Sequence, residues 1–100
     1  MNNEKRFGNT KKKSVINFAK IVKGMAYISM DRSQVKEVMI ECQIDGVITR
    51  HKPDHDNVAI TDTCYNVLVN LGDNLKIYTN TGGELLVTCE KGRVRPEVIK

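Results

Sequence analysis

The chain has 100 residues, of which 40% are hydrophobic and 28% are charged, a size and composition typical of one compact domain. No apolar run approaches the roughly 18 residues that a membrane-spanning helix requires, which excludes an integral membrane protein. The charged first 14 residues lead into no long apolar stretch, which argues against a secretory signal. We therefore expect a cytoplasmic protein with no membrane partner.

Basic charge is concentrated near the amino terminus. Seven basic residues against the single acid Glu4 give residues 1–24 a charge of +6, whereas nine basic and eleven acidic residues give residues 25–100 a charge of −2. A basic segment can neutralise the phosphates of a nucleic acid. We predict a flexible basic arm at residues 1–13, and the open alternative is a solvated tail. The candidate nucleic-acid-binding residues are Lys11, Lys12, Lys13, Lys23 and Arg50.

Two amphipathic helices are predicted after the arm. Apolar residues between 15 and 22 recur at helical spacing, and Gly24 follows them as a terminator. A second stripe of this kind runs through residues 35–42 and stops at Asp45-Gly46. An amphipathic helix buries its apolar stripe against a partner surface, so we expect both helices to cover a sheet.

Beyond Gly46 the apolar period changes to two, which predicts strands. We expect these strands at residues 47–51, 58–62, 64–70, 75–80 and 84–90, the last three forming an antiparallel meander. Pro96 is expected to end the last strand, so that residues 96–100 form a tail. The predicted fold class is α+β: two N-terminal amphipathic helices packed on a four- to five-stranded, mainly antiparallel sheet, in a single domain of residues 14–95.

The cysteines do not suggest a disulfide framework, because there are three of them and none forms a Cys-x-x-Cys pair. We interpret Cys42, Cys64 and Cys89 as small buried hydrophobic residues in a reducing cytoplasm. The alternative interpretation is a reactive thiol.

Both histidines lie in the short segment from His51 to Asp56, together with two carboxylates. Two histidines with a nearby aspartate could supply two or three ligands to a divalent metal. Pro53 indicates a loop, however, and a loop lacks the fixed spacing that a helix would give the ligands. We therefore predict a solvated polar loop and no metal or other cofactor.

Metal-free cleavage of RNA requires a base, an acid and cations that stabilise the phosphate. Histidine can act as base or acid because its pKa is near neutrality, so His51 and His55 are candidates, with Lys20 and Arg93 among the cations. In the strand 84–90, alternation places Thr88 on the same face as two glutamates. Thr88 is either a β-favouring surface residue or a hydroxyl that binds a phosphate on an open sheet face.

Four stretches carry a resemblance to a known class: residues 35–39 leading into 45–48, then 65–69, 75–79 and 86–88. From about residue 18 to residue 92 the layout resembles the toxin-type ribonuclease domains grouped around RelE, barnase, EndoU and the colicin tRNases, and especially a small uncharacterised bacterial family among them. The resemblance implies helical segments followed by a sheet that closes with three antiparallel strands.

Such families commonly place a His and an Arg in the first helix, where this chain has Lys20 and Lys23. The resemblance therefore implies either a domain that is not a nuclease or a relocated catalytic set. The relocated set consists of His51, His55, Lys20, Thr88 and Arg93.

Two functional hypotheses follow. The first is a small toxin-like RNA-binding domain that acts as a metal-independent endoribonuclease, with RNA bound through the basic amino-terminal region and an antitoxin as protein partner. The second is a non-catalytic binding or inhibitor protein, such as phages and mobile elements encode, whose partner is a protein or a nucleic acid. A base-stacking platform would need Tyr65 and Tyr78 on one open sheet face. A homodimer is a further option, because an uncovered sheet face would expose Leu68, Leu86 or Ile77.

Overall fold

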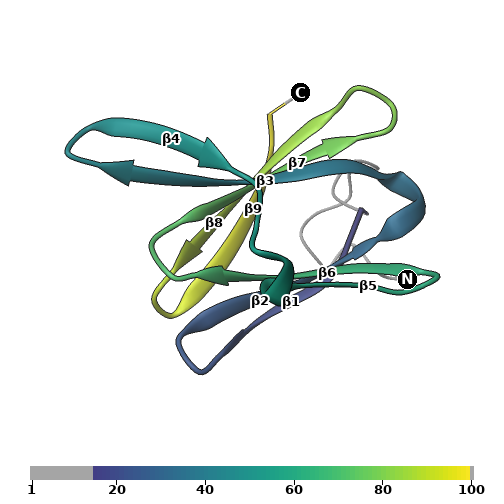
Figure 1. The fold of residues 1–100 in the computed structure, drawn as a ribbon, viewed down its shortest axis with the longest axis horizontal. Coiled ribbons are helices and arrows are strands. Elements are labelled where there is room, and N and C mark those ends of the chain that lie inside the picture. Colours follow the sequence, from purple (N-terminus) through teal and green to yellow (C-terminus); the bar gives the residue numbers. More distant parts are fainter. Residues whose placement is uncertain (1–14, 100) are drawn as a thin grey trace.

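The computed structural model describes residues 15–99, which form two antiparallel β-sheets packed face to face (Figure 1). The four-stranded sheet has the order β1-β2-β6-β5 and consists of β1 (Ile16–Val22), β2 (Met25–Asp31), β6 (Cys64–Asn70) and β5 (Val58–Ile60). The five-stranded sheet has the order β4-β3-β7-β8-β9 and consists of β4 (Val47–His51), β3 (Val35–Ile44), β7 (Asn74–Thr79), β8 (Glu84–Glu90) and β9 (Arg93–Val98). Two short 3-10 helices, η3 (Arg32–Gln34) and η4 (His55–Asn57), lie where the chain crosses between the sheets.

The prediction of an α+β fold is wrong, because the described residues contain no α-helix. The residues assigned to the first helix form β1 and its turn into β2, and those assigned to the second helix form most of β3. Helices therefore do not cover a sheet in this part of the chain. Each sheet instead buries its inner face against the other.

Two β-bulges explain why these strands show helical spacing. A bulge inserts one extra residue into a strand, so that the inward-facing residues on either side of it are three positions apart rather than two. The register of β1 with β2 shifts near the start of β1, which leaves Ile16 and Ala19 on the same inner face. The register of β3 with β7 shifts in the same way and leaves Val35 and Val38 on one face. An apolar interval of three is also the signature of a helix.

The two glycine positions that were expected to end helices are hairpin turns. Val22 pairs with Met25 across Lys23-Gly24, and Ile44 pairs with Val47 across Asp45-Gly46. The φ angles are +51° and +79° in the first turn and +53° and +81° in the second. Positive φ at both central residues defines a type I′ turn, whose twist matches that of the two strands it joins.

The predicted strand positions are largely confirmed. Strands β4, β6 and β8 occupy the predicted residues 47–51, 64–70 and 84–90, whereas β7 begins one residue earlier and β5 ends at Ile60. The predicted meander is wrong, because β6 belongs to the four-stranded sheet while β7 pairs with β3 and β8. Residues 96–98, expected in a tail, belong to β9, where Pro96 lies opposite Val87 on an edge strand that tolerates proline.

The core lies between the sheets and is almost entirely aliphatic. Among residues 15–99 no aromatic residue is fully buried in it, although the half-buried Tyr65 packs against it. The fully buried residues of β2, β6, β7 and β8 alternate along each strand with residues that face outward. The largest are Ile28, Met30, Leu75, Ile77 and Leu85.

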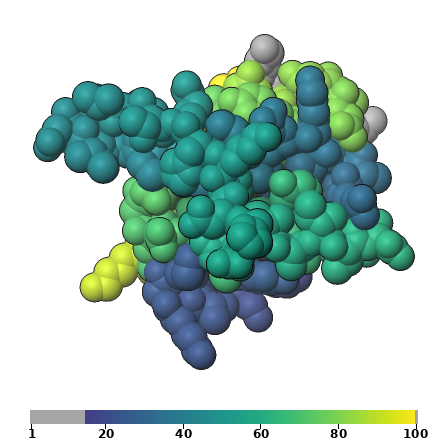
Figure 2. All heavy atoms as spheres, in the orientation of Figure 1, coloured from purple at the N-terminus to yellow at the C-terminus, as the bar shows by residue number. Residues whose placement is uncertain are grey.

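The hairpin formed by β3 and β4 extends beyond the packed sheets (Figure 1), and its atoms stand out from the body of the molecule (Figure 2). All five residues of β4 are exposed. On the opposite side of the sandwich β1 and β9 are in contact. The two sheets are therefore in contact along the side of β1 and β9, whereas the β3–β4 hairpin projects from the other side.

We predict that Leu85→Ala lowers the free energy of unfolding by about 2–5 kcal/mol, because the side chain is fully buried between the sheets. The neighbouring Leu86 faces outward and is half-buried, so Leu86→Ala is the matched control and should cost clearly less. Urea denaturation followed by circular dichroism measures both values. Equal losses for the two variants would contradict the assignment of the inner face.

Candidate functional site

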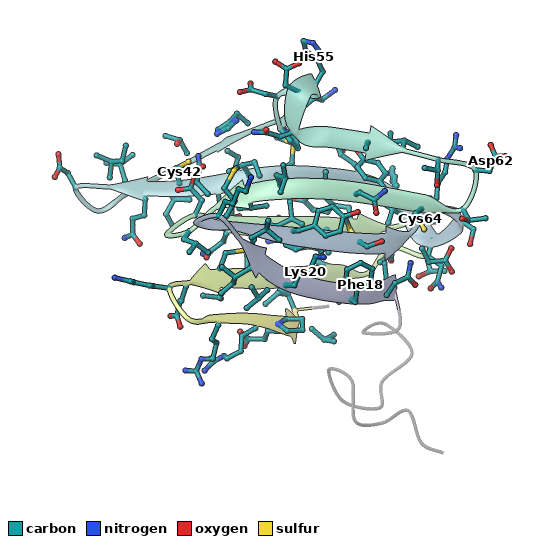
Figure 3. The ribbon with its side chains drawn as sticks, turned by 90° about the horizontal axis from the view of Figure 1, so that it is seen from below. Phe18, Lys20, Cys42, His55, Asp62 and Cys64 are labelled. Carbon is teal, nitrogen blue, oxygen red and sulfur yellow. The ribbon has the colours of Figure 1, made fainter. Side chains whose placement is uncertain are left out.

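The structure does not bring the five predicted catalytic residues together. Lys20 lies on the outer face of the four-stranded sheet, because its partner Tyr27 alternates with the buried Ala26 and Ile28. Thr88 and Arg93 lie on the outer face of the five-stranded sheet, beyond the core. The two histidines occupy the end of β4 and the η4 turn, and Figure 3 shows His55 well away from Lys20. No common substrate phosphate could therefore contact all five side chains.

His51 instead contacts Cys42, a cysteine predicted to be a buried core residue. Its Nε2 atom lies 3.7 Å from Cys42 Sγ, and its Nδ1 atom lies 2.9 Å from the carbonyl oxygen of Lys52. Both residues line a cavity of about 210 Å³ at one end of the sandwich, together with Asp54 and Asp73. The register places Cys42 opposite Thr49 and His51 opposite Ile40. The proximity of Cys42 and His51 therefore follows from the hairpin turn at Asp45-Gly46, which the sequence predicts as a helix end.

His55 Nε2 lies 3.2 Å from Asp56 Oδ1, and the His55 side chain is 97% exposed. Within residues 15–99, no group of three or more His, Cys, Asp or Glu side chains is arranged to hold a metal ion. The predicted polar segment is thus divided between the end of β4 and η4.

The outer face of the five-stranded sheet carries charges of both signs. Register places five glutamates and four basic residues there. Three ion pairs join members of this set, namely Arg50–Glu41 at 2.6 Å, Lys76–Glu84 at 3.1 Å and Arg93–Glu90 at 3.8 Å. Thr88 lies opposite Arg95 in this face. Because most of these cations are already paired, the face offers little net attraction to a polyanion.

The outer face of the four-stranded sheet carries an aromatic pair. The rings of Phe18 on β1 and Tyr27 on β2 lie 5.7 Å apart between centroids and are tilted by 46°. Lys20 Nζ lies 5.8 Å from the centre of the Tyr27 ring, within the range of a cation–π interaction. Phe18 is 44% exposed, and Figure 3 shows it on β1 with Lys20. We refer to Phe18, Lys20 and Tyr27 as the aromatic face.

The surroundings of the aromatic face are apolar or neutral on β6. Leu68 lies opposite Tyr27, and Asn66 lies opposite Ser29. Lys23 adds a second cation in the turn between β1 and β2. Asp31, at the far end of β2, accepts hydrogen bonds from Gln34 and Ser33, which lower the pKa of its carboxyl group. The aromatic face therefore combines the exposed ring of Phe18 and the half-buried ring of Tyr27 with local positive charge.

The predicted stacking residues Tyr65 and Tyr78 do not share a face. Tyr65 lies opposite Met30 on the inner side of the four-stranded sheet, where burial and then Glu37 raise the pKa of its phenol. Tyr78 lies on the outer face of the five-stranded sheet, opposite Glu84. Sequence reasoning missed the aromatic face because it depends on the Lys23-Gly24 turn. Once that turn is recognised, Lys20 is placed opposite Tyr27.

The remaining predicted nucleic-acid contacts fall in three places. Lys11, Lys12 and Lys13 lie outside the described residues. Lys23 borders the aromatic face, whereas Arg50 is paired with Glu41 on the other sheet. Of the residues proposed to expose a dimer face, Ile77 belongs to the core, while Leu68 and Leu86 lie on different outer faces.

Comparisons with protein-family models, with curated proteins and with solved structures find no match to this chain. Among the described residues, no helix is long and apolar enough to cross a membrane.

The cysteine environments lead to a prediction about thiol reactivity. Burial, then a hydrogen bond with Asp73 and the charge of its carboxylate, raise the pKa of Cys42. Burial, and then the charge of Asp73, raise the pKa of Cys89 to about 12. Removing the Asp73 charge lowers the pKa of Cys42 and so increases its thiolate fraction. We therefore expect Asp73→Asn to accelerate alkylation of Cys42 by about two- to fivefold near pH 8. Mass spectrometry after iodoacetamide labelling measures the rate.

Asp62→Asn, which neutralises an exposed loop carboxylate, is the control for this experiment and should leave the rate unchanged. Cys89 is 1% exposed and should remain unlabelled in the folded protein. Identical rates for Asp73→Asn and the unmodified chain would contradict the assigned role of Asp73.

Proposed function

We propose that this protein binds single-stranded RNA in the cytoplasm, on the aromatic face of its four-stranded sheet. We propose also that it does not cleave the bound RNA. The observation that carries the proposal is the exposed ring of Phe18 beside the half-buried ring of Tyr27, with Lys20 Nζ 5.8 Å from the centre of the Tyr27 ring. Unstacked bases present flat faces that stack on aromatic side chains, and nearby cations neutralise the phosphates.

Single strands fit this face better than duplexes do. The bases of a duplex are stacked on each other, so exposed rings on an open sheet cannot reach their flat faces. A single strand lying across β1 and β2 can place one base against Phe18 or Tyr27 and a phosphate near Lys20 or Lys23. Asn66 adds a half-buried polar side chain on the same surface, whereas Ser29 is buried.

Electrostatics favour this face over the opposite one. The five-stranded sheet also has a cation over a tyrosine, with Lys76 Nζ 5.9 Å from the centre of the Tyr78 ring. Lys76, however, is paired with Glu84 at 3.1 Å, and glutamates surround it. Lys20 belongs to the strand that follows the basic segment 1–13 in the sequence, so arm and face could act on the same polyanion.

Binding is favoured over cleavage because the candidate acid–base groups lie elsewhere. Neither histidine lies on the aromatic face: His51 contacts Cys42, and His55 is paired with Asp56. General acid–base catalysis requires the base within hydrogen-bonding reach of the proton that it removes. The toxin-type resemblance implies helical segments at the start of the domain, whereas residues 15–99 contain no α-helix.

We predict that Phe18→Ala and Lys20→Ala each weaken binding of a short fluorescent single-stranded RNA by about tenfold at low salt, because stacking and phosphate neutralisation are lost. Tyr78→Ala and Lys76→Ala are matched controls, since they remove the equivalent pair from the opposite sheet. Fluorescence anisotropy titrations measure the affinities, and a DNA strand of the same sequence tests selectivity. Equal losses in both sets of variants, or no binding by the unmodified chain, would overturn the proposal.

A second prediction concerns the arm and the absence of cleavage. Deleting residues 1–13 removes five basic residues, so retention on heparin should fall and depend less steeply on salt. Labelled RNA incubated with the full chain in EDTA should remain intact on a gel. Retention that survives the deletion would show that the arm takes no part, and cleavage that His51→Ala abolishes would restore the ribonuclease hypothesis.

A further inference from the structure

The tip of the β3–β4 hairpin exposes large aliphatic side chains. Ile44, Val47 and Ile48 are 69%, 61% and 55% exposed. They flank the tight turn of the β3–β4 hairpin, which projects from the body of the molecule (Figure 2). Water-exposed isoleucine and valine side chains grouped at the tip of a hairpin indicate a surface that another molecule covers.

Strand β4 also has an unpaired edge. It pairs only with β3, and it ends the five-stranded sheet. Edge strands are usually protected by lysine, proline or a bulge, and β4 has none of these between Val47 and His51. Its one permanent charge, Arg50, is held by Glu41 at 2.6 Å. The edge is therefore available for antiparallel pairing with another strand.

A cavity lies where β4 ends. It has a volume of about 430 Å³, and its apolar lining comes from Val38 on β3, Val58 on β5 and Tyr65 on β6. Lys36 and Lys52 contribute basic side chains to the same cavity, together with Pro53, His55 and Glu37. It is thus an apolar depression with mainly basic groups around it, close to the carboxyl end of the exposed strand.

We propose that a second copy of this chain covers the β3–β4 hairpin, by antiparallel pairing of the two β4 edges about a twofold axis near Thr49. In that arrangement Val47 lies opposite His51 of the partner subunit. The turn at Asp45 then lies beside Lys52 of the partner subunit, at the mouth of the partner's cavity. An antiparallel pair of identical strands necessarily brings the beginning of each strand to the end of the other.

The chemistry of the tip matches that of the cavity. Ile44 and Val47 lie opposite each other on one face of the hairpin, on the same side as the inner face of the sheet, and they can fill an apolar depression. Asp45 forms no ion pair within the described residues, and the cavity offers two lysines. The contact is reciprocal, so each copy supplies one tip and one cavity. A second copy accounts for the free edge, the apolar tip and the charge at the turn together.

The dimer would leave the aromatic face open. Strands β1 and β2 lie in the other sheet, and the free edge of β4 is at the margin of the five-stranded sheet. The inference therefore does not depend on the proposed function. Loss of the dimer and loss of nucleic-acid binding can be measured separately.

Charge reversal provides the sharpest test. Asp45→Lys should weaken the dimer, because it brings lysine against the partner's Lys52, and Lys52→Asp should weaken it by opposing two aspartates. Asp45→Lys preserves the turn type, since Lys23-Gly24 already adopts the same conformation in this chain. When the two variants are mixed, both reciprocal contacts become Lys–Asp pairs, and the mixed dimer should form.

Sedimentation velocity of the full chain, from micromolar to near-millimolar concentration, measures the mass. The unmodified chain should be dimeric, each charge variant alone should have a dimer dissociation constant raised by about tenfold or more, and the mixture should regain the dimer. Val47→Lys should also weaken the dimer. Ile60→Lys is the control, because Ile60 is 50% exposed on the edge strand of the other sheet.

Four results would each overturn the proposal. The unmodified chain could stay monomeric at the highest concentration, the dimer could survive Val47→Lys, or it could fail to re-form in the mixture. A dimer lost in Ile60→Lys would place the interface at β5 instead. Circular dichroism of each variant separates loss of the dimer from loss of the fold.

Discussion

The structure depends on the burial of one face of each sheet against the other. The buried core is made of mainly aliphatic side chains from six strands, β1, β2, β3, β6, β7 and β8, and almost every buried residue alternates with an outward-facing one. This alternation decides which side chains are available for function. Lys20 and Thr88 lie on strands of different sheets and face away from the common core, so the sandwich itself keeps them apart.

The pattern of turns and bulges explains which parts of the fold could be predicted from sequence. Strands β4, β6 and β8 have a regular period of two and were placed correctly. Strands β1 and β3 each contain a bulge, and an extra residue changes the local apolar interval from two to three. Asp45-Gly46 follows such an interval, so it was read as a helix end, although Asp-Gly is also among the strongest hairpin signals.

The candidate site was less predictable than the strands because it depends on pairing. Phe18 and Tyr27 are nine positions apart, and nothing in their local sequence relates them until the Lys23-Gly24 turn pairs β1 with β2. The contact between Cys42 and His51 likewise follows from the second hairpin. Single-residue chemistry identified Lys20 and His51 as notable residues. It could not supply their partners, because strand partners are set by long-range register rather than by composition.

The two proposed surfaces use different sheets, and this separation has a physical consequence. The aromatic face is built on β1 and β2, whereas the self-pairing edge belongs to β4. A twofold dimer would therefore carry two aromatic faces on one particle. A nucleic-acid strand long enough to contact both would bind the second face intramolecularly, at an effective concentration set by the length between them. A single sheet face with one aromatic pair offers few contacts to a flexible strand, and pairing two such faces raises the apparent affinity without any new contact within each copy.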